Sequence, residues 1–511
     1  MPVNQQKLPA REKIGYAMGD AAANLVFQMM LMFQLMFYTD VFGLEGLVAG
    51  TVLLIARVAD AFVDPAVGIL SDKTSTRWGK YRPWILWTAL PFCVFYVLAF
   101  WNPGIADKAL VAIYATVSYV LLMSCYSMVN TPYCSLGGVM TSDIGERTSL
   151  NTYRFVAVTI GQIVVQGATL PLVDQLGGAN RQQGWLLTVG LFSVLSFCCL
   201  MATFRITRER VSPPPLQQTS LREDLRDTIS DASWRAVVLL TFFLFIALAM
   251  WNSAMSFYFR YAVDHKSLAD FLNVLGMQVD RHYAYSVGFS VFNISAALIQ
   301  LLGILCLSQY LARRYGKKEV VTVCLLLTAL FTALFWIPQK TDVPLMFVLN
   351  LLRSLAYAPT IPLLWAMMGD VADHVEYLSN RRSTGLCFSG MTFSLKLGLG
   401  FGGVLTGFLL SVFGYASGDG SGSVLVQSEM AETGIRLTSS LVPALSLAVG
   451  VWALHRSPIT KVYNERMQSE LSGRRWIRLL GAGRYTSGAG APTPSAVSVQ
   501  SSVKHSVSNE E

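Results

Sequence analysis

Long apolar runs separated by short polar segments fill this chain from its start to about residue 456. Most runs are roughly 18 to 27 residues long, which suits α-helices that cross a hydrocarbon core of about 30 Å at about 1.5 Å per residue. Transmembrane β-strands are shorter and alternate in polarity, so a β-barrel is disfavoured. The pattern predicts twelve spans, which begin near Ile14, Leu47, Trp84, Ala109, Leu150, Trp185, Arg235, Ala284, Val320, Val343, Ser383 and Leu437.

One long polar segment, residues 205–233, interrupts this pattern and leaves six predicted spans on each side. A short echo relates the two sides, because Arg77-Trp78-Gly79-Lys80 follows the second span and Arg314-Tyr315-Gly316-Lys317 follows the eighth. Repeated six-helix halves are typical of major facilitator transporters. We therefore predict an all-α integral membrane protein with two six-helix bundles, at residues 1–204 and 234–456, joined by a cytoplasmic linker at residues 205–233.

The chain after the last span, residues 457–511, is predicted to be a cytoplasmic tail. Its first part, from Lys461 to Leu480, mixes basic and apolar residues as a helix on a membrane surface does. From about residue 481 the tail is rich in Ser, Gly, Ala, Val and Pro, a composition typical of disorder. A solvated tail without function is the plainer interpretation.

Composition agrees with a membrane location. The 511 residues are 53% hydrophobic and 14% charged, whereas soluble proteins are about 25% charged, and the mean hydropathy is +0.47. The net charge of +8 comes from basic residues that gather in alternate loops. By the positive-inside rule this pattern puts both termini in the cytoplasm, although the mixed charge of residues 263–283 weakens it slightly. We expect a multi-pass protein of the cell inner membrane, without a removable signal peptide and without a nucleic-acid partner.

Nothing in the sequence indicates an enzyme. It contains no P-loop, dinucleotide fingerprint, HExxH motif or nucleophile elbow. The eight cysteines fall in or beside apolar spans without metal-type spacing, and the five histidines are scattered. We therefore predict no catalytic residue, no cofactor and no required protein partner.

Three charges stand inside the second predicted span. Arg57, Asp60 and Asp64 are spaced i, i+3 and i+7, so they share one helix face. A charged side chain at the bilayer centre costs about 2.5 to 3.5 kcal/mol, so this face must point into the bundle. Two carboxylates one turn apart repel each other, and a bound cation or a shared proton relieves that repulsion. A plain ion pair between Arg57 and Asp60 is the structural alternative.

A second polar group is spread over spans one, four and five. Asp20 can accept hydrogen bonds and Arg154 can donate them through a planar fork, a combination that can hold vicinal hydroxyl groups. The fourth span ends in an unusually polar run from Tyr126 to Ser135, in which Ser127 and Asn130 lie one turn apart. Interfacial positions, a salt bridge or polar contacts between helices are the alternatives.

The C-terminal half adds a lysine inside a span and a charged loop. Lys396 lies deep in the eleventh span, and a lysine that reaches the membrane interface is the alternative. After the tenth span come Asp370, Asp373 and Glu376, followed by Arg382. Opposed charges there could form a gate, and a solvated loop with local salt bridges is equally consistent.

Several longer motifs extend over nearly the whole chain, to about Leu471. They are Gly19-Asp20, Phe37-Tyr38-Thr39-Asp40-Val41-Phe42-Gly43, Ala56-Arg57 with Asp60-Ala61 and Asp64-Pro65, Thr76-Arg77-Trp78-Gly79-Lys80-Tyr81-Arg82-Pro83, Asn130-Thr131-Pro132-Tyr133, Tyr153-Arg154-Phe155 and Gly434-Ile435-Arg436. In these motifs the chain resembles the glycoside-pentoside-hexuronide:cation symporter family, whose members couple sugar uptake to sodium, lithium or protons.

The resemblance implies roles for single residues. It implies a cation site at Asp60, Asp64 and Ser127, with a possible sodium at the two aspartates. The candidate substrate-binding residues are Asp20, Tyr126, Asn130, Cys134, Arg154 and Lys396, and the candidate gating or structural charges are Arg57, Asp370, Asp373, Glu376 and Arg382.

Three positions depart from the family pattern. Asn130 stands where the family has a second sugar-binding aspartate, and Cys134 stands where it has a sugar-stacking tryptophan, so a galactoside specificity is not implied. Val63 replaces an asparagine that helps to bind sodium. Because a proton needs only a carboxylate whereas sodium needs several oxygen ligands, we expect a proton rather than sodium as the coupling ion.

These observations together predict a secondary active transporter that imports a sugar, glycoside or uronide by cation symport with alternating access. A uniporter, a carrier of another amphiphilic solute, and a non-transporting membrane sensor are the alternatives.

Overall fold

The computed structural model describes residues 8–141, 144–178, 180–210, 221–379, 384–417 and 426–471. The chain up to Lys461 forms one compact unit, and the chain from Val462 forms a second. The regular structure in the described residues is helical, apart from one isolated bridge between Thr76 and Gly79.

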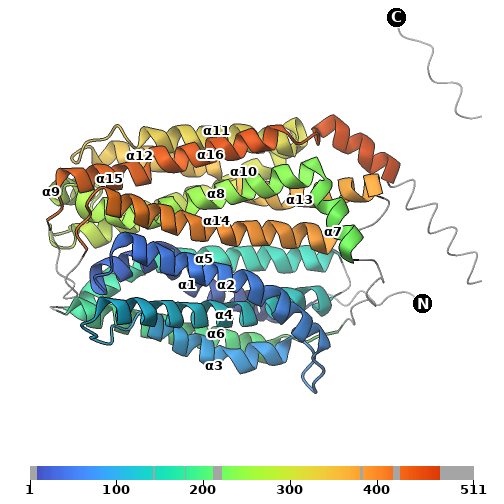
Figure 1. The fold of residues 1–511 in the computed structure, drawn as a ribbon, viewed down its shortest axis with the longest axis horizontal. Helices are drawn as coiled ribbons and strands as arrows, with labels where there is room; N and C mark the ends of the chain where they lie inside the picture. The colour runs from blue at the N-terminus through green and yellow to red at the C-terminus, as the bar shows by residue number, and fades with distance from the viewer. Residues whose placement is uncertain are drawn as a thin grey trace, which may run out of the picture. The chain divides into compact units, whose positions relative to one another are not determined.

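The first six long helices of the large unit lie side by side in the lower part of Figure 1. Helix α1 packs against α5 and α6, while α4 packs against both α2 and α3. Their bounds are α1 (Ala10–Met36), continued by the π-helix η1 (Phe37–Val41), α2 (Gly46–Lys73), α3 (Arg82–Ala99), α4 (Lys108–Met140), α5 (Ile144–Gly177) and α6 (Arg181–Ile206).

The remaining helices of the large unit form the upper part of Figure 1. Helix α8 packs against α14 and α16, and α11 packs against α12 and α16. Their bounds are α7 (Leu221–Ser230), α8 (Ala232–Phe257), continued by η2 (Tyr258–Ala262), α9 (His265–Val274), α10 (Ala284–Tyr315), α11 (Lys317–Leu334), α12 (Val343–Tyr357), α13 (Thr360–Ser379), α14 (Thr384–Val412), α15 (Glu429–Ser439) and α16 (Leu441–His455).

Eleven spans in the described residues are long and apolar enough to cross a membrane. Helix α11 occupies the place of the ninth predicted span, and its 18 residues begin with the charged Lys317, Lys318 and Glu319. The predicted all-α membrane fold with twelve spanning helices is therefore confirmed.

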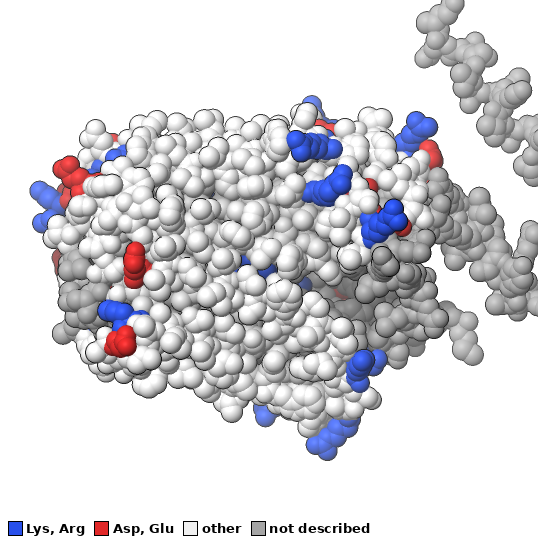
Figure 2. Space-filling model, in the orientation of Figure 1, with Lys and Arg blue, Asp and Glu red and all other residues white. Residues whose placement is uncertain are grey.

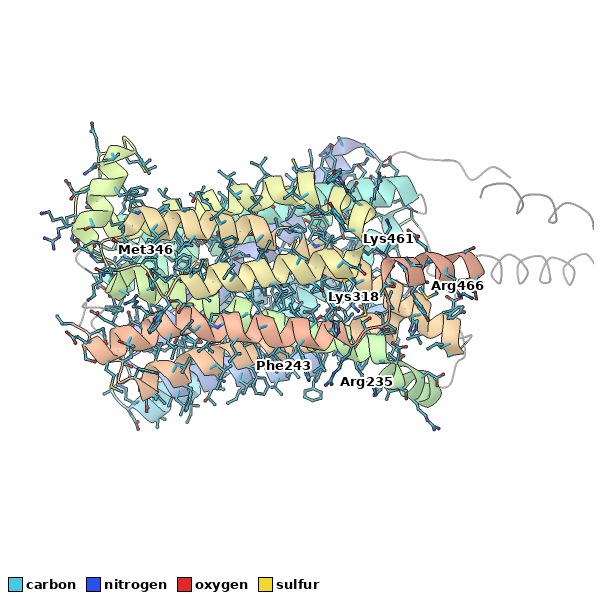
Figure 3. The ribbon with its side chains drawn as sticks, turned by 90° about the horizontal axis from the view of Figure 1, so that it is seen from above. Arg235, Phe243, Lys318, Met346, Lys461 and Arg466 are labelled. Atoms are coloured by element: carbon cyan, nitrogen blue, oxygen red, sulfur yellow. The ribbon has the colours of Figure 1, made fainter. Side chains whose placement is uncertain are left out.

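Charged side chains on the face in Figure 2 lie mainly towards the two ends of the helices, and a broad uncharged band separates them. Figure 3 shows Lys318 and Lys461 at one end and Met346 towards the other. Lys318 Nζ donates to the backbone carbonyl of Ser457 at 2.5 Å, and Lys461 Nζ donates to that of Arg313 at 2.9 Å. These contacts fix the basic turn between α10 and α11 against the residues that follow α16.

The two groups of helices meet along α2 and α14, where glycines allow the backbones to approach closely. A Cβ atom on Gly407 would collide with the carbonyl oxygen of Gly46, and one on Gly50 would lie 2.8 Å from the carbonyl oxygen of Gly403. Helix α1 meets α8, and α5 meets α10, across the same boundary.

Two predicted segments are described only in part. Residues 462–471 of the second unit are helical, within the segment predicted to form a surface helix, and the tail from residue 481 lies outside the described residues. In the predicted linker, α7 is described and residues 211–220 are not. The division at residues 204 and 234 stays a prediction.

Candidate functional site

Two carboxylates from α2 and one ammonium group from α14 meet inside the large unit. Lys396 Nζ lies 2.8 Å from Asp60 Oδ2 and forms a second ion pair with Asp64 Oδ2. The i, i+4 spacing of the aspartates puts both side chains on the face of α2 that meets α14 and α4. The three charges form one cluster, which we call the acid pair with its lysine.

Two hydroxyl groups from α4 complete this cluster. The Ser127 hydroxyl donates to Asp60 Oδ1, and Thr131 Oγ1 donates to Asp64 Oδ1 at 3.0 Å. Lys396 Nζ also donates to Ser127 Oγ at 3.3 Å. Each carboxylate therefore has one hydroxyl donor and the shared ammonium group.

The two aspartates differ in their access to solvent. The side chain of Asp60 is 0% exposed and that of Asp64 is 25% exposed, while that of Lys396 is 10% exposed. Asp64 is therefore the more accessible of the two carboxylates.

Arg57 does not form the ion pair with Asp60 that was the structural alternative. Its Cζ lies 5.6 Å from the centre of the Phe27 ring, and the ion-pair partner of Asp60 is Lys396. Arg57 is nevertheless buried, so it belongs to the interior of the bundle.

A second cluster joins α1, α4 and α5. Arg154 Nε donates to Asp20 Oδ2 at 2.5 Å, and Arg154 Nη2 lies 3.6 Å from the Cys134 sulfur. The guanidinium also lies over the ring of Tyr133, which stacks on Tyr16 with ring centres 4.6 Å apart. Among the described residues, neither Asp20 Oδ1 nor Arg154 Nη1 has a hydrogen-bond partner, so this cluster keeps one acceptor and one donor.

Helix α4 links the two clusters. Ser127 and Thr131 contact the acid pair, while Cys134, one turn further along, contacts Arg154. The Cys134 sulfur also lies 4.0 Å from Asn130 Oδ1. The ring of Tyr126, which was also a candidate for substrate binding, lies near the rings of Phe27 and Phe92.

The structure places the charged residues of α13 near one end of the bundle. Lys317 Nζ on α11 lies 2.7 Å from Asp370 Oδ1, so this aspartate has a partner within the C-terminal group of helices. Glu376 is buried and Asp373 is partly buried, and each interacts with other residues. Arg382 lies outside the described residues, and the predicted gate stays a prediction.

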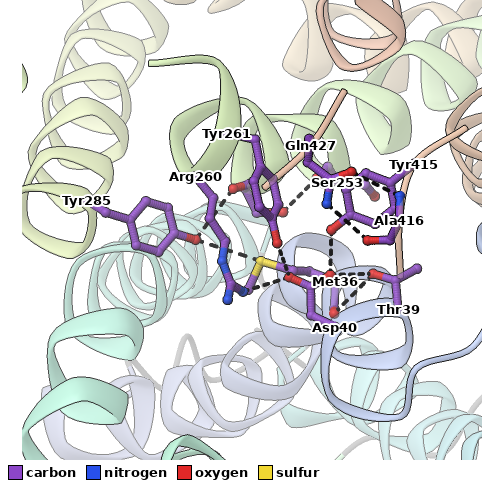
Figure 4. A network of polar contacts seen from close by, with 11 residues as sticks. Met36, Thr39, Asp40, Ser253, Arg260, Tyr261, Tyr285, Tyr415, Ala416 and Gln427 are labelled. Carbon is purple, nitrogen blue, oxygen red and sulfur yellow. Dashed lines mark hydrogen bonds and ion pairs between the residues drawn. The ribbon is translucent and has the colours of Figure 1, made fainter. Parts of the chain in front are cut away.

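Figure 4 shows a further polar network, centred on Asp40 of η1, that the sequence reasoning missed. Asp40 Oδ2 accepts hydrogen bonds from Arg260 Nη1 at 2.6 Å and from the Tyr261 hydroxyl at 3.0 Å, both on η2. Asp40 Oδ1 accepts from the Tyr415 hydroxyl at 2.6 Å. The side chains of Asp40 and Arg260 are each 3% exposed, so this ion pair is buried between the two groups of helices.

The comparisons with known proteins agree with this arrangement. The family described as MFS/sugar transport protein matches residues 15–280 and 281–461. The inner membrane symporter YicJ of Escherichia coli (strain K12) is 37% identical over 418 residues, which are 81% of this chain and 85% of the relative. The isoprimeverose transporter of Lactiplantibacillus pentosus is 29% identical over 90% of this chain and 91% of the relative.

A solved structure shares the fold at low identity. The crystal structure of nucleoside transporter NupG matches with a TM-score of 0.58 and 13% identity, and it covers 88% of this chain and 99% of that one.

Proposed function

Because this chain belongs to the MFS/sugar transport protein family, and is a membrane transporter and not an enzyme, we propose that it imports a sugar, glycoside or uronide together with a proton. Relatives named as symporters and as a sugar transporter support the general class. The observation that carries the proposal is the charge balance of the acid pair with its lysine.

Two ionised carboxylates and one ammonium group leave one negative charge in a buried cluster. Such an excess charge is costly away from water, so the cluster favours the uptake of one positive charge. Lys396 already occupies the place of a first cation between the two aspartates. A proton on Asp64, the more exposed carboxylate, completes the neutralisation.

The ligand set favours a proton over sodium. Sodium is a hard cation that needs several oxygen ligands, and the ammonium group of Lys396 takes up the carboxylate oxygens Asp60 Oδ2 and Asp64 Oδ2. Val63 adds no oxygen on the same helix. Protonation needs no further ligand.

The sugar binds, on this proposal, at the cluster of Asp20 and Arg154. The unpaired Asp20 Oδ1 accepts a hydrogen bond from one hydroxyl group of the sugar, and the unpaired Arg154 Nη1 donates to a neighbouring one. Asn130, Cys134 and Lys396 are further candidates for substrate contacts, because Cys134 contacts Arg154 and Asn130, and Lys396 contacts the acid pair. Tyr126 supports this region through its packing on Phe27.

Coupling follows because one helix contacts both ligands. Protonation of Asp64 changes its hydrogen bond with Thr131 and its ion pair with Lys396. Because Thr131 and Cys134 lie one turn apart on α4, this change reaches the contact of Cys134 with Arg154. Each ligand then raises the affinity for the other by the same factor, as linkage requires.

Alternating access is part of the proposal, and contacts between the two groups of helices support one of its states. The glycine contact of α2 with α14 and the buried pair of Asp40 and Arg260 support a state closed at the end where α2 begins. By the positive-inside rule this end faces the periplasm and both termini face the cytoplasm.

Uptake of a panel of radiolabelled glycosides and uronides into energised vesicles tests the proposal. We expect accumulation that a protonophore abolishes and that added sodium at fixed pH and membrane potential leaves unchanged. Stimulation by sodium would overturn the choice of ion, and no accumulation of any saccharide would overturn the function.

Asp64→Asn separates symport from the alternatives. It removes the carboxylate proposed to take up the proton, so accumulation against a gradient should fall at least tenfold while exchange of sugar down a gradient persists. Asp270→Asn, at an exposed position of α9, is the matched control and should keep accumulation. A uniporter would show no difference between the two variants, and a sensor would transport nothing in either.

A further inference from the structure

Arg353 on α12 is a buried guanidinium away from both clusters described above. The residue is 9% exposed, and its Cζ lies 3.6 Å from the centre of the Trp251 ring on α8. Its Nε donates to Thr332 Oγ1 at 3.3 Å. No carboxylate among the described residues forms an ion pair with it.

An arginine keeps its positive charge in proteins, so this charge stays in the helix core. Stacking on the tryptophan ring offsets part of the desolvation cost, because the ring face is negative. The ring cannot accept hydrogen bonds from the guanidinium edges, however. Arg353 Nη1 and Nη2 therefore lack acceptors among the described residues.

A small cavity lies beside this guanidinium, between α8, α11, α12 and α16. It has room for about one water molecule or one small ion. Its lining residues are Leu244, Ala247, Leu248, Thr328, Thr332, Arg353, Tyr357 and Leu447. All but Leu248 are buried, so the cavity lies inside the bundle and not on the lipid face.

The unused donors that line the cavity belong to Arg353 and Tyr357. Thr328 and Thr332 give their hydroxyl protons to backbone carbonyls at 2.7 Å in each case. The Tyr357 hydroxyl has no hydrogen-bond partner among the described residues, and it lies one helical turn from Arg353 on the same face of α12. The cavity therefore presents a positive charge and an unused hydroxyl donor, without a carboxylate.

We propose that this cavity binds a small monovalent anion, such as chloride, between the Arg353 guanidinium and the Tyr357 hydroxyl. The single positive charge of Arg353 is balanced by a single negative charge. The small volume of the cavity excludes phosphate, sulfate and lipid headgroups. The anion supplies the acceptor that Arg353 lacks, and it stabilises the packing of α12 against α8, α11 and α16. This inference does not depend on the proposed transport function.

Thermal unfolding of the purified full-length protein in detergent tests it, with chloride exchanged for gluconate at constant ionic strength. We expect the Tm to rise by about 2 to 4 °C and to saturate as chloride replaces gluconate. Bromide should substitute for chloride and give an anomalous scattering peak beside Arg353. Equal Tm values in chloride and gluconate would mean that the cavity holds water only, and would overturn the proposal.

Variants assign the effect to this cavity. Arg353→Gln should abolish the chloride dependence, and the milder Tyr357→Phe should weaken it about tenfold in chloride concentration. Arg436→Gln is the matched control, because Arg436 also stacks on a tryptophan, Trp336, but donates to two backbone carbonyls. If Arg353→Gln does not fold, the comparison of the chloride dependence of the Tm between the wild type and Tyr357→Phe decides the test. Loss of the chloride effect in Arg436→Gln to the same degree would also overturn the proposal.

Discussion

At the scale of single residues, Lys396 connects the two carboxylates of the acid pair. Its ammonium group contacts both aspartates and Ser127, and so joins three helices at one point. A tethered cation of this kind cannot leave. In this structure it lowers the repulsion between the carboxylates, and on the proposed mechanism only the remaining negative charge is left for the coupling ion.

Removal of this ammonium group should change the pH range of transport. In Lys396→Gln the two carboxylates face each other without a cation, so only the coupling ion is left to relieve their repulsion. The dependence of sugar exchange on pH, measured in proteoliposomes, should then differ from that of the wild type. Lys340→Gln, which removes a more exposed lysine paired with Glu432, is the control. An unchanged pH profile in Lys396→Gln would refute this role.

Sequence reasoning found the residues that the helix period relates, and missed those that only the fold brings together. Asp60 and Asp64 are one turn apart, so their shared face could be predicted. Thr131 lies one turn after Ser127, so the same rule could have identified it. The contact of Lys396 with Asp60 joins residues more than 300 positions apart, so no helix period predicts it. Arg353 was missed, although an arginine inside an apolar span was a usable signal.

At the scale of elements, two helices determine the site. Helix α4 contributes side chains to both clusters, with Ser127 and Thr131 at the acid pair and Cys134 at Arg154. Helix α14 brings Lys396 to α2 through glycines that let the backbones touch. The spans and their approximate starts follow from hydrophobic length alone. The close contact of α2 with α14 could not be predicted, because glycine runs also serve bends and turns.

A single methyl group at this contact should weaken it. In Gly407→Ala the added Cβ collides with the carbonyl of Gly46, so α2 and α14 must separate at a cost of about 1 to 3 kcal/mol. The unfolding temperature in detergent should fall accordingly. Gly190→Ala on α6, where a Cβ would meet nothing within 4 Å, is the control and should unfold at or slightly above the wild-type temperature. Equal losses in both variants would show that the helix contact is not the cause.

At the scale of the whole large unit, the buried pair of Asp40 and Arg260 joins the two groups of helices. Its partners are 220 residues apart and come from two π-helical turns, η1 and η2, that extend α1 and α8. No periodic pattern relates them, so the sequence predicted two bundles without predicting what holds them together.

A double-mutant cycle measures this contact. Asp40→Asn leaves Arg260 buried without its partner and should cost about 3 to 5 kcal/mol of stability. The double variant with Arg260→Gln should cost less than the sum of the two single variants, because the second change removes the stranded charge. Chemical unfolding in mild detergent gives the three values. Strict additivity would mean that the two side chains do not act as a pair.

On the proposed mechanism, the charge count of the acid pair with its lysine also determines how the membrane voltage acts on the cycle. With a proton bound, the cluster is neutral, and its passage across the bilayer is indifferent to the electric field. Without a proton it carries one negative charge, and a full crossing is then worth about 2.3 kcal/mol per 100 mV. An inside-negative potential drives that charge outward. In an energised cell the voltage would therefore accelerate the return of the empty carrier. The step with sugar and proton bound would depend on the concentration gradients of the sugar and the proton.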